Sequence, residues 1–204
     1  MRELENGQGI GREQRELMLG QRGLVVWLYG LSGSGKSTIA AAIERHLSAE
    51  KVLCRVLDGD SLRSGLCSGL GFDAEARKEN IRRAAETARL FLDTGVVTIA
   101  AFICPFRELR DLARQIVGEN DFVEVYLKAS YEACARRDVK GLYAKAEKGE
   151  VPFFTGKDSP FEEPEPISSA IILETERHGI ARCCERVLDV VLPRVRERVS
   201  PDYD

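Results

Sequence analysis

Histidine is nearly absent from this sequence, with only two among 204 residues. The six cysteines form no Cys-x-x-Cys pair, which argues against a zinc site or a disulfide framework. We therefore expect reduced thiols that are mostly buried as small apolar side chains. They are Cys54, Cys67, Cys104, Cys134, Cys183 and Cys184.

The sequence also lacks a long hydrophobic run. Its longest apolar stretches, 24–28 and 96–103, are far shorter than the ~18 to 20 residues that span a bilayer. The first residues are charged and dotted with glycine, without the continuous apolar core of a secretory signal. We expect no membrane partner and a cytoplasmic protein.

Neither sign of charge dominates. The formal net charge is −3, whereas general nucleic-acid binders usually display a strongly basic field, so we expect no nucleic-acid partner. Hydrophobic residues make up 44% and charged residues 31%, as in ordinary packed proteins. The length favours one domain with at most a small appendage.

Short apolar, β-branched runs alternate with longer segments of helical period along the chain. This alternation predicts βαβ units and a mainly parallel sheet with helices on both faces. Ligands of such sheets bind beyond the carboxyl ends of the strands. The helical segments are expected at 36–49, 75–93, 108–117 and 131–138.

Two segments depart from this alternation. Residues 141–166 contain four prolines and no sustained period, which predicts a long surface loop of the kind that forms lids. The N-terminal twenty or so residues are expected to form a loosely attached helix or arm. After a last strand in "SAIILET", a helix should start near Ile180 and be ended or kinked by Pro193.

The stretch "GLSGSGKST" fits the pattern G-x-x-x-x-G-K-[ST] between an apolar strand and a helical segment. Its glycines let backbone N–H groups curl around phosphate oxygens at a helix N-terminus. Lys36 would reach the β- and γ-phosphates, and the Ser37 hydroxyl would ligate Mg²⁺. The loop therefore predicts a site for ATP, which would contact Gly30, Ser32, Gly33, Ser34, Gly35, Lys36, Ser37 and Thr38.

Two carboxylates follow the second apparent strand, in "LDGDSLRSGL". Asp58 and Asp60 would emerge beside the phosphate loop, where a carboxylate can hold a Mg²⁺-bound water or accept the proton of an attacking hydroxyl. The sequence does not decide which aspartate has which role. An Asp-Gly turn with a helix cap at Asp60 or Ser61 is the alternative interpretation.

Taken together, "GLSGSGKST", "LDGD-x-x-R-x-GL", "GFDAEARKENIRRAAE", "AFICPFR-x-x-R", "RRDVKGLYAKAEKGE" and "FTGKDSPFEEP" closely resemble adenylylsulfate kinases. These enzymes phosphorylate the 3′-hydroxyl of adenosine 5′-phosphosulfate with MgATP in sulfate assimilation. The resemblance runs in order over about 23–166. It implies a three-layer α/β P-loop kinase fold over 23–204, an N-terminal arm over 1–22 and a mobile lid over 141–166.

The resemblance also implies the residues that line the adenylylsulfate site. An anionic sulfate-phosphate anhydride needs guanidinium groups, and an adenine ring needs an aromatic or apolar face. Arg137, on the hinge side of the lid, could reach the ATP base or phosphates. The implied acceptor-site residues are Asp60, Arg63, Phe72, Arg77, Asn80, Ile103, Cys104, Pro105, Lys140, Leu142 and Phe154.

Structural roles remain open for several of these residues: core packing for Phe72 and Phe154, and a solvated helix face for Arg77, Asn80, Arg137 and Lys140. Cys104 stands where the family usually has a serine that is associated with a phosphorylated form in some members, and we expect a cysteine there to be compatible with direct transfer to substrate. Lys157 and Phe161 replace the isoleucine and tyrosine more often found in the lid. A homodimer is expected from the resemblance alone.

Other functions also remain open. Another small P-loop kinase, acting on a sugar, a nucleoside monophosphate or a shikimate-like alcohol, would share Lys36 and Ser37. An ATP-binding sensing or assembly module would need no acceptor-side base, so Asp58 and Asp60 argue against it. A nucleic-acid-stimulated ATPase would need a basic stripe that the sequence lacks.

Overall fold

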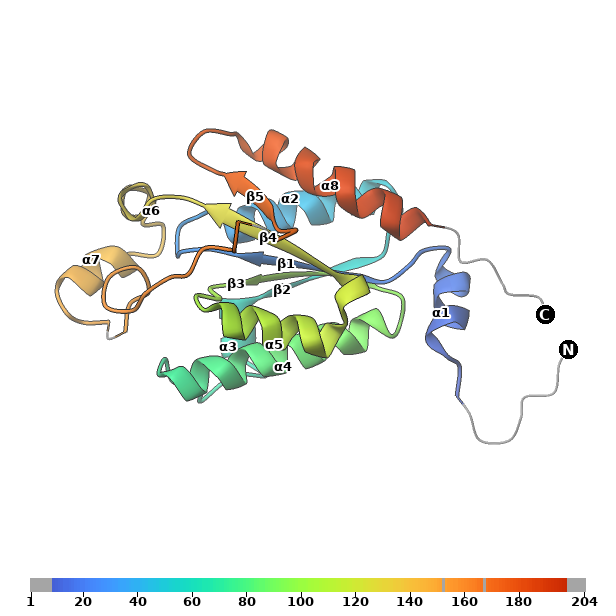
Figure 1. The fold of residues 1–204 in the computed structure, drawn as a ribbon, viewed down its shortest axis with the longest axis horizontal. Coiled ribbons are helices and arrows are strands. Elements are labelled where there is room, and N and C mark those ends of the chain that lie inside the picture. Colours follow the sequence, from blue (N-terminus) through green and yellow to red (C-terminus); the bar gives the residue numbers. More distant parts are fainter. Residues whose placement is uncertain (1–8, 152, 167, 198–204) are drawn as a thin grey trace, which may run out of the picture.

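A computed structural model describes residues 9–151, 153–166 and 168–197. Five parallel strands form one sheet in the order β2-β3-β1-β4-β5, with helices on both faces (Figure 1). The strands are β1 (Leu24–Tyr29), β2 (Cys54–Asp58), β3 (Val97–Phe102), β4 (Phe122–Lys128) and β5 (Ile171–Glu174). The three-layer α/β architecture expected from the sequence is therefore confirmed.

Helices lie in every connection between these strands, and one more helix lies before the first strand and one after the last. The α-helices are α1 (Arg12–Leu19), α2 (Lys36–Ala49), α3 (Gly59–Arg63), α4 (Ala74–Leu92), α5 (Arg107–Val117), α6 (Tyr131–Arg137), α7 (Leu142–Glu147) and α8 (Ile180–Arg196). A short 3₁₀ turn, η1 (Glu119–Asp121), precedes β4. The four helices expected from periodicity are α2, α4, α5 and α6, each within one residue of its expected bounds.

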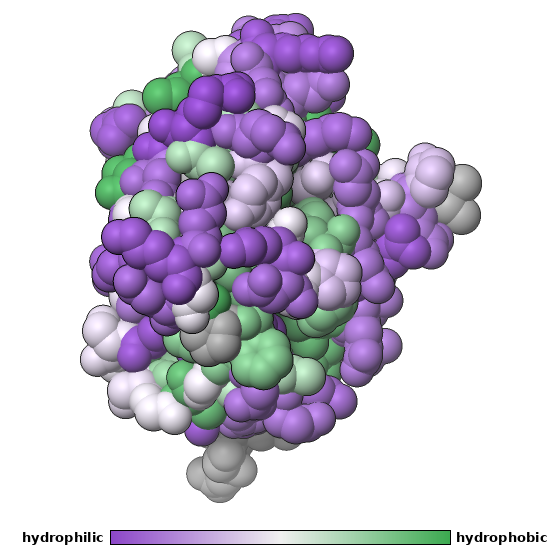
Figure 2. Space-filling model, turned by 90° about the vertical axis from the view of Figure 1, so that its left-hand side faces the viewer, coloured by the Kyte–Doolittle hydropathy of each residue, from purple (hydrophilic) through white to green (hydrophobic). Residues whose placement is uncertain are grey.

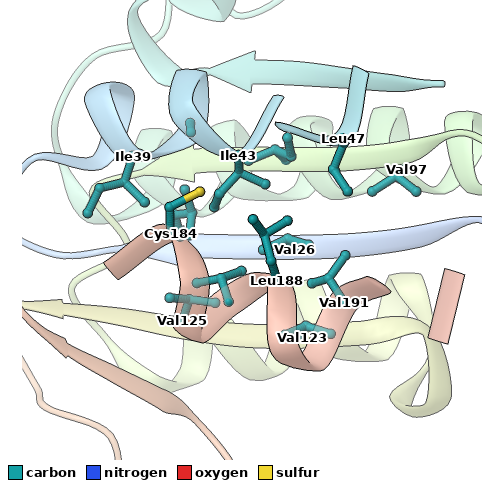
Figure 3. Close-up of a cluster of buried hydrophobic side chains, with 14 of the residues drawn as sticks. Val26, Ile39, Ile43, Leu47, Val97, Val123, Val125, Cys184, Leu188 and Val191 are labelled. Carbon is teal, nitrogen blue, oxygen red and sulfur yellow. The ribbon is translucent and has the colours of Figure 1, made fainter. Parts of the chain in front are cut away.

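The central strands are buried on both faces, which explains why they read as continuous apolar runs. Because strand side chains alternate between faces, Val26 and Leu28 of β1 point to the layer of α2 and α8. Figure 3 shows Ile43 of α2 and Leu188 of α8 closing over Val26 in that layer. Trp27 and Tyr29 face the opposite layer, which α4 and α5 cover.

The carboxyl ends of the strands point to one end of the molecule, where α6 and α7 lie (Figure 1). A small third cluster holds the lid segment there. It joins Leu31, next to the end of β1, to Cys134 of α6, Tyr143 and Ala146 of α7, and Phe154. The loops that could bind a ligand are thus supported by packed side chains.

The sequence predicts a loop over the whole lid segment, 141–166, but part of this segment is helical. Residues 142–147 form α7, whose N-cap Gly141 has a left-handed φ of 64°. Tyr143 and Ala146, three residues apart, turn inward and are buried. One and a half turns with a single buried pair carry too little period to be detected in the sequence.

The N-terminal segment contains a helix, α1, but α1 and the residues after it are not loosely attached, and residues 1–8 of the expected arm lie outside the described residues. Arg12 donates to Asp121 Oδ2 at 2.5 Å and to Glu16 Oε1 at 2.8 Å. Glu16 is buried and accepts from the Gly23 backbone N–H. Gln21 bonds to both backbone groups of Leu53. Polar contacts to distant segments thus hold this helix, together with Leu19, whose side chain lies against Gly95; its weak apolar pattern gave no sign of them.

Pro193 does not end the last helix, because α8 continues to Arg196. Proline at this position removes one backbone hydrogen bond to Asp189. Val191 and Val195, on either side of it, are fully buried in the core. Their burial holds the final turn in place despite the missing bond.

The six cysteines, all within the described residues, are free, and five of them are buried. No group of three or more potential His, Cys, Asp or Glu metal ligands occurs among the residues that the structure describes. Within the same ranges, no helix has the length and apolar character required to cross a membrane.

Candidate active site

Two glycines of the loop between β1 and α2 stand where neighbouring atoms leave no room for a side chain. Gly30 has φ 155°, and a Cβ there would lie 2.6 Å from the Leu127 carbonyl oxygen and 2.8 Å from Ser34 Oγ. Gly33 has φ 75°, and a Cβ there would lie 3.0 Å from the Cys134 carbonyl oxygen. Both positions therefore require glycine, and the tight turn leaves backbone N–H groups free to face a phosphate at the start of α2.

Lys36 is folded back over this loop. Its Nζ donates to the carbonyl oxygens of Gly30 at 3.0 Å and Leu31 at 2.6 Å. Desolvation within the loop lowers the pKa of Lys36 to about 8. The ammonium is thus held where phosphate oxygens would replace two backbone carbonyls as its partners.

Ser37 and the two aspartates meet at the mouth of the loop. Ser37 Oγ donates to Asp58 Oδ2 at 2.7 Å, while Asp58 Oδ1 caps α3 by accepting from the Asp60 backbone N–H at 3.0 Å. The helix cap foreseen at Asp60 or Ser61 is therefore Asp58. The Asp60 carboxylate is exposed and forms an ion pair with Lys140, which lies between α6 and α7.

These groups border a cavity of about 470 Å³ at the carboxyl edge of the sheet. Figure 2 shows this end of the molecule as a largely hydrophilic face with apolar side chains between the polar ones. Predicted residues that line the cavity are Ser32, Gly33, Ser34, Gly35, Lys36, Ser37, Thr38, Asp58, Asp60, Ile103, Arg137 and Lys140. The structure therefore brings most of the predicted ATP residues together with both aspartates.

Arg137 braces the far side of the loop. Its Nη1 donates to the Gly33 carbonyl oxygen at 3.2 Å, and its Nη2 donates to the Thr175 carbonyl oxygen at 2.8 Å. It thus joins the phosphate loop to the segment that follows β5. Arg137 therefore makes specific contacts, and a solvated helix face, the alternative interpretation, does not describe it.

A second group of predicted residues lies near the start of α4. Arg63 Nη1 donates to the Leu70 and Gly71 carbonyls, and its guanidinium lies 4.3 Å from the centroid of the Phe72 ring. Phe72 is 53% exposed, so the core-packing alternative is wrong for it. The stacked arginine and exposed ring form a surface suited to a planar, anionic ligand.

Arg77 connects α4 to the lid. It donates to the Phe72 carbonyl at 2.7 Å, to the Phe153 carbonyl at 2.7 Å and to Thr155 Oγ1 at 3.2 Å. Burial and the positive charge of Arg63 lower the pKa of Arg77 from its usual value. An anion bound between the two arginines would relieve this repulsion.

The side chains of Asn80 and Phe154 are more buried than their predicted roles in binding adenylylsulfate suggest. Asn80 is buried, and its Oδ1 has no hydrogen-bond partner among the described residues. Phe154 is 7% exposed and packs edge-on against Tyr143, with ring centroids 4.9 Å apart. The structure therefore favours core packing, the alternative interpretation of Phe154. Leu142 is partly buried and packs against the same cluster.

Cys104 and Pro105 are buried behind the cavity wall, and Ile103 is the member of this trio that lines the cavity described by the structure. Burial raises the pKa of the Cys104 thiol to about 12. The thiol therefore stays protonated at neutral pH and has little nucleophilic character.

The two unusual lid residues have clear partners. Lys157 Nζ donates to the Ala146 carbonyl at 2.7 Å, near the C-terminus of α7. The Phe161 ring lies 5.7 Å from the Tyr126 ring and 6.3 Å from the Tyr29 ring. Both contacts hold the lid segment against the body of the domain.

Sequence reasoning missed several residues of the site. Tyr143 lines the cavity and donates to the Ser32 carbonyl at 2.7 Å, fixing the phosphate loop from the lid side. Its place three residues after Lys140, in a segment taken for a loop, gave no signal. Other missed lining residues are Ile39, Gly59, Ala101, Asp138, Val139, Thr175, His178, Gly179, Ile180 and Cys183.

A phosphate loop between a buried strand and a helix, on a parallel sheet covered by helices, defines a P-loop nucleotide-binding fold, which small kinases share with nucleotide hydrolases. The family model described as adenylylsulphate kinase matches residues 22–172. The adenylyl-sulfate kinase of Phocaeicola vulgatus is 52% identical over 189 residues, which cover 93% of this chain and 92% of that protein. The chain belongs to the adenylylsulfate kinase family.

Solved structures agree with this assignment. The Mycobacterium tuberculosis APS kinase in complex with AMPPNP and APS has a TM-score of 0.78 and 41% identity, covering 84% of this chain and 98% of that one. The hexameric APS kinase from Thiobacillus denitrificans has a TM-score of 0.63 and 26% identity, covering 91% of this chain and 31% of that one. The fold and family expected from the sequence are thus confirmed.

Proposed function

We propose that this protein transfers the γ-phosphoryl group of MgATP to the 3′-hydroxyl of adenosine 5′-phosphosulfate, forming ADP and 3′-phosphoadenosine 5′-phosphosulfate. The observation that carries this proposal is the placement of Lys36, Ser37, Asp58 and Asp60 around one cavity in a chain of this family. The relatives named above carry the name of this activity.

ATP would bind with its phosphates in the loop from Gly30 to Thr38. Lys36 would exchange its two carbonyl partners for β- and γ-phosphate oxygens, and the backbone N–H groups of the loop would donate to the remaining oxygens. Arg137 and Thr175 would border the nucleotide on the side away from Asp60.

Ser37 and Asp58 fit a Mg²⁺ site. Mg²⁺ prefers oxygen ligands and is usually held by one or two protein oxygens together with phosphate oxygens and waters. The Ser37 hydroxyl and Asp58 Oδ2, 2.7 Å apart at the mouth of the loop, supply oxygens of this kind. When bound there, Mg²⁺ would offset the negative charge that builds up during transfer. Ser37 would coordinate it directly, and Asp58 would hold one of its waters.

Asp60 is the better placed of the two aspartates to act on the acceptor hydroxyl. Both oxygens of Asp58 are already engaged, one by Ser37 and one by the N-terminus of α3. Asp60 presents an exposed carboxylate to the cavity, next to Lys140. It would orient the 3′-hydroxyl and accept its proton while Lys36 stabilises the transferred group.

The acceptor would lie between the start of α4 and the lid. Arg63 and Arg77 would bind its phosphosulfate, Phe72 would contact the adenine, and the unpaired Oδ1 of Asn80 would accept from a ligand N–H or O–H. The remaining predicted acceptor-site residues would act as walls, with Ile103 in the cavity and Cys104, Pro105, Leu142 and Phe154 behind it or in the lid.

We also propose a cytoplasmic homodimer that serves sulfate assimilation, with a single kinase domain over 23–204, an arm over 1–22 and a lid over 141–166 that closes on the acceptor. A native mass measurement tests the assembly, with a hexamer, as named for the Thiobacillus relative, among its outcomes.

A coupled assay of ADP release with MgATP tests the reaction. We expect release that depends on adenylylsulfate, is absent with AMP, and is abolished by Lys36→Ala; chromatography should detect the 3′-phosphorylated product. ATP binding without stimulation by adenylylsulfate would reject the proposal. Release stimulated by another alcohol would assign the chain to a different small kinase activity.

A further inference from the structure

Arg110 of α5 is one of the most deeply buried charged residues described, with a side chain only 2% exposed. Its guanidinium lies 4.5 Å from the centroid of the Tyr29 ring, and its Nε is 3.4 Å from Glu124 Oε1. Its Nη1 donates a hydrogen bond of 3.0 Å to the carbonyl oxygen of Cys104. One side chain thus joins α5, β1, β4 and the connection that follows β3.

The ion pair with Glu124 does not by itself explain why an arginine is buried at this position. Removing two charges from water is costly, and apolar residues of similar volume often replace a buried ion pair without loss of stability. An apolar side chain, however, could not donate to the Cys104 carbonyl. The hydrogen bond to this carbonyl is therefore the contact that specifically requires a guanidinium.

The Cys104 carbonyl belongs to a short irregular connection, 103–106, between β3 and α5. Its first residue, Ile103, lines the cavity. Next to Cys104, the Pro105 carbonyl accepts from the Glu162 backbone N–H at 2.8 Å, at the C-terminal end of the lid segment. Glu162 Oε2 in turn accepts from the Arg107 backbone N–H at 2.7 Å. The connection thus links the cavity wall to the lid.

We propose that Arg110 is a positioning residue for the acceptor pocket. By fixing the Cys104 carbonyl from beneath, it sets the place of Ile103 on the cavity wall and of Pro105, to which the end of the lid is attached. This role rests on the proposed function, because the pocket so positioned is the one assigned to adenylylsulfate. Arg110 also contacts β1 through the Tyr29 ring, one residue before the phosphate loop, but among the contacts that the structure describes it makes no hydrogen bond to that loop.

Arg114 offers a matched control one turn further along α5. It also pairs with Glu124, and its guanidinium lies 5.4 Å from the centroid of the Phe122 ring. Within the contacts that the structure describes, Arg114 makes no hydrogen bond to the 103–106 connection. Arg110 and Arg114 therefore share the ion-pair partner and differ in the contact to the Cys104 carbonyl.

The decisive variant is the double substitution Arg110→Met with Glu124→Gln, which removes both charges while keeping the side-chain volumes. We expect the variant to fold with a lower thermal stability than wild type, because the Cys104 carbonyl loses its donor and Arg114 loses its charged partner. The KM for adenylylsulfate should rise about tenfold or more, since small displacements of a binding wall have large effects, while the KM for ATP stays within about twofold. Arg114→Met should leave both KM values within about twofold of wild type.

Arg110→Lys provides a second test, and it decides the matter if the double variant does not fold. A single ammonium keeps the charge next to Glu124 but cannot hold the carboxylate and the Cys104 carbonyl together, so the KM for adenylylsulfate should again rise selectively. An unchanged KM in a folded variant, or an equal rise for both substrates, would overturn the positioning role. A wild-type protein without adenylylsulfate-dependent turnover would instead refute the proposed function.

Discussion

Ser37 Oγ donates a hydrogen bond of 2.7 Å to Asp58 Oδ2, joining the first turn of α2 to the end of β2. Strand β1, which leads through the phosphate loop into α2, is not a neighbour of β2, because β3 lies between them. The contact therefore spans the carboxyl edge of the sheet and presents two oxygens of the kind that Mg²⁺ prefers beside the phosphate loop.

Ser37→Ala should raise the Mg²⁺ concentration needed for half-maximal turnover, because a direct ligand is lost, and should lower kcat by about 10²-fold or more. Mg²⁺ titrations at saturating ATP measure both effects. Ser37→Thr keeps the hydroxyl and is the matched control. An alanine variant with an unchanged Mg²⁺ requirement would remove Ser37 from the proposed site.

The sequence predicts those residues of the site that follow from a local pattern or from the order of the strands. The phosphate loop is a local pattern: backbone geometry demands glycine at position 30, and Lys36 stands at the spacing that the pattern gives to the phosphate-binding lysine. Asp58 and Asp60 follow from strand order, since parallel strands end at one edge.

Contacts between distant segments could not be derived in this way. The bond from Tyr143 to the Ser32 carbonyl and that from Arg110 to the Cys104 carbonyl end on backbone groups, which leave no residue pattern. Helix α7 is too short for a detectable period, and Pro193 is tolerated because buried valines surround it. In each case tertiary packing overrides the local signal.

The affinity for ATP should fall as the pH rises above about 8. The pKa of Lys36 is lowered to about 8 by desolvation, so the free protein loses this positive charge through that range. Phosphate oxygens favour the charged form, so binding at pH 9 should take up as much as one proton. Calorimetry in buffers of different ionisation enthalpy measures the uptake. Lys36→Met should bind ATP weakly and without this proton uptake.

Arg77→Ala should raise the KM for adenylylsulfate by about 10- to 100-fold and leave the KM for ATP nearly unchanged. The arginine contacts the Phe72 loop and the lid residues Phe153 and Thr155, on the acceptor side alone. A charge-assisted hydrogen bond contributes about 1.5–3 kcal/mol, which sets the scale of the loss. The neighbouring Lys78, exposed and 3.7 Å from Glu108, is the control. Equal losses for Arg77→Ala and Lys78→Ala would contradict a specific role.

Gln21→Ala should destabilise the fold without altering catalysis. The Gln21 amide donates to the Leu53 carbonyl at 2.9 Å and to the Gly95 carbonyl at 2.8 Å, and accepts from the Leu53 backbone N–H at 2.7 Å. Loss of these partners in a buried position should lower the free energy of unfolding by roughly 2 kcal/mol. Urea unfolding measures it, with the exposed Gln115→Ala as control. A change of less than about 0.5 kcal/mol would show that the contacts of Gln21 contribute little to stability.

Asp60→Asn should lower kcat by about 10²- to 10⁴-fold, the range expected when a group that accepts a proton is removed. Its binding of MgATP should remain, because Asp60 lies beside the phosphate loop and pairs with Lys140 rather than with Ser37. Asp58→Asn should behave differently and change the Mg²⁺ requirement, because Asp58 shares the hydrogen bond with Ser37. Steady-state kinetics at several Mg²⁺ concentrations separate the two roles. If Asp58→Asn abolished turnover at saturating Mg²⁺ while Asp60→Asn remained active, the two roles would have to be exchanged.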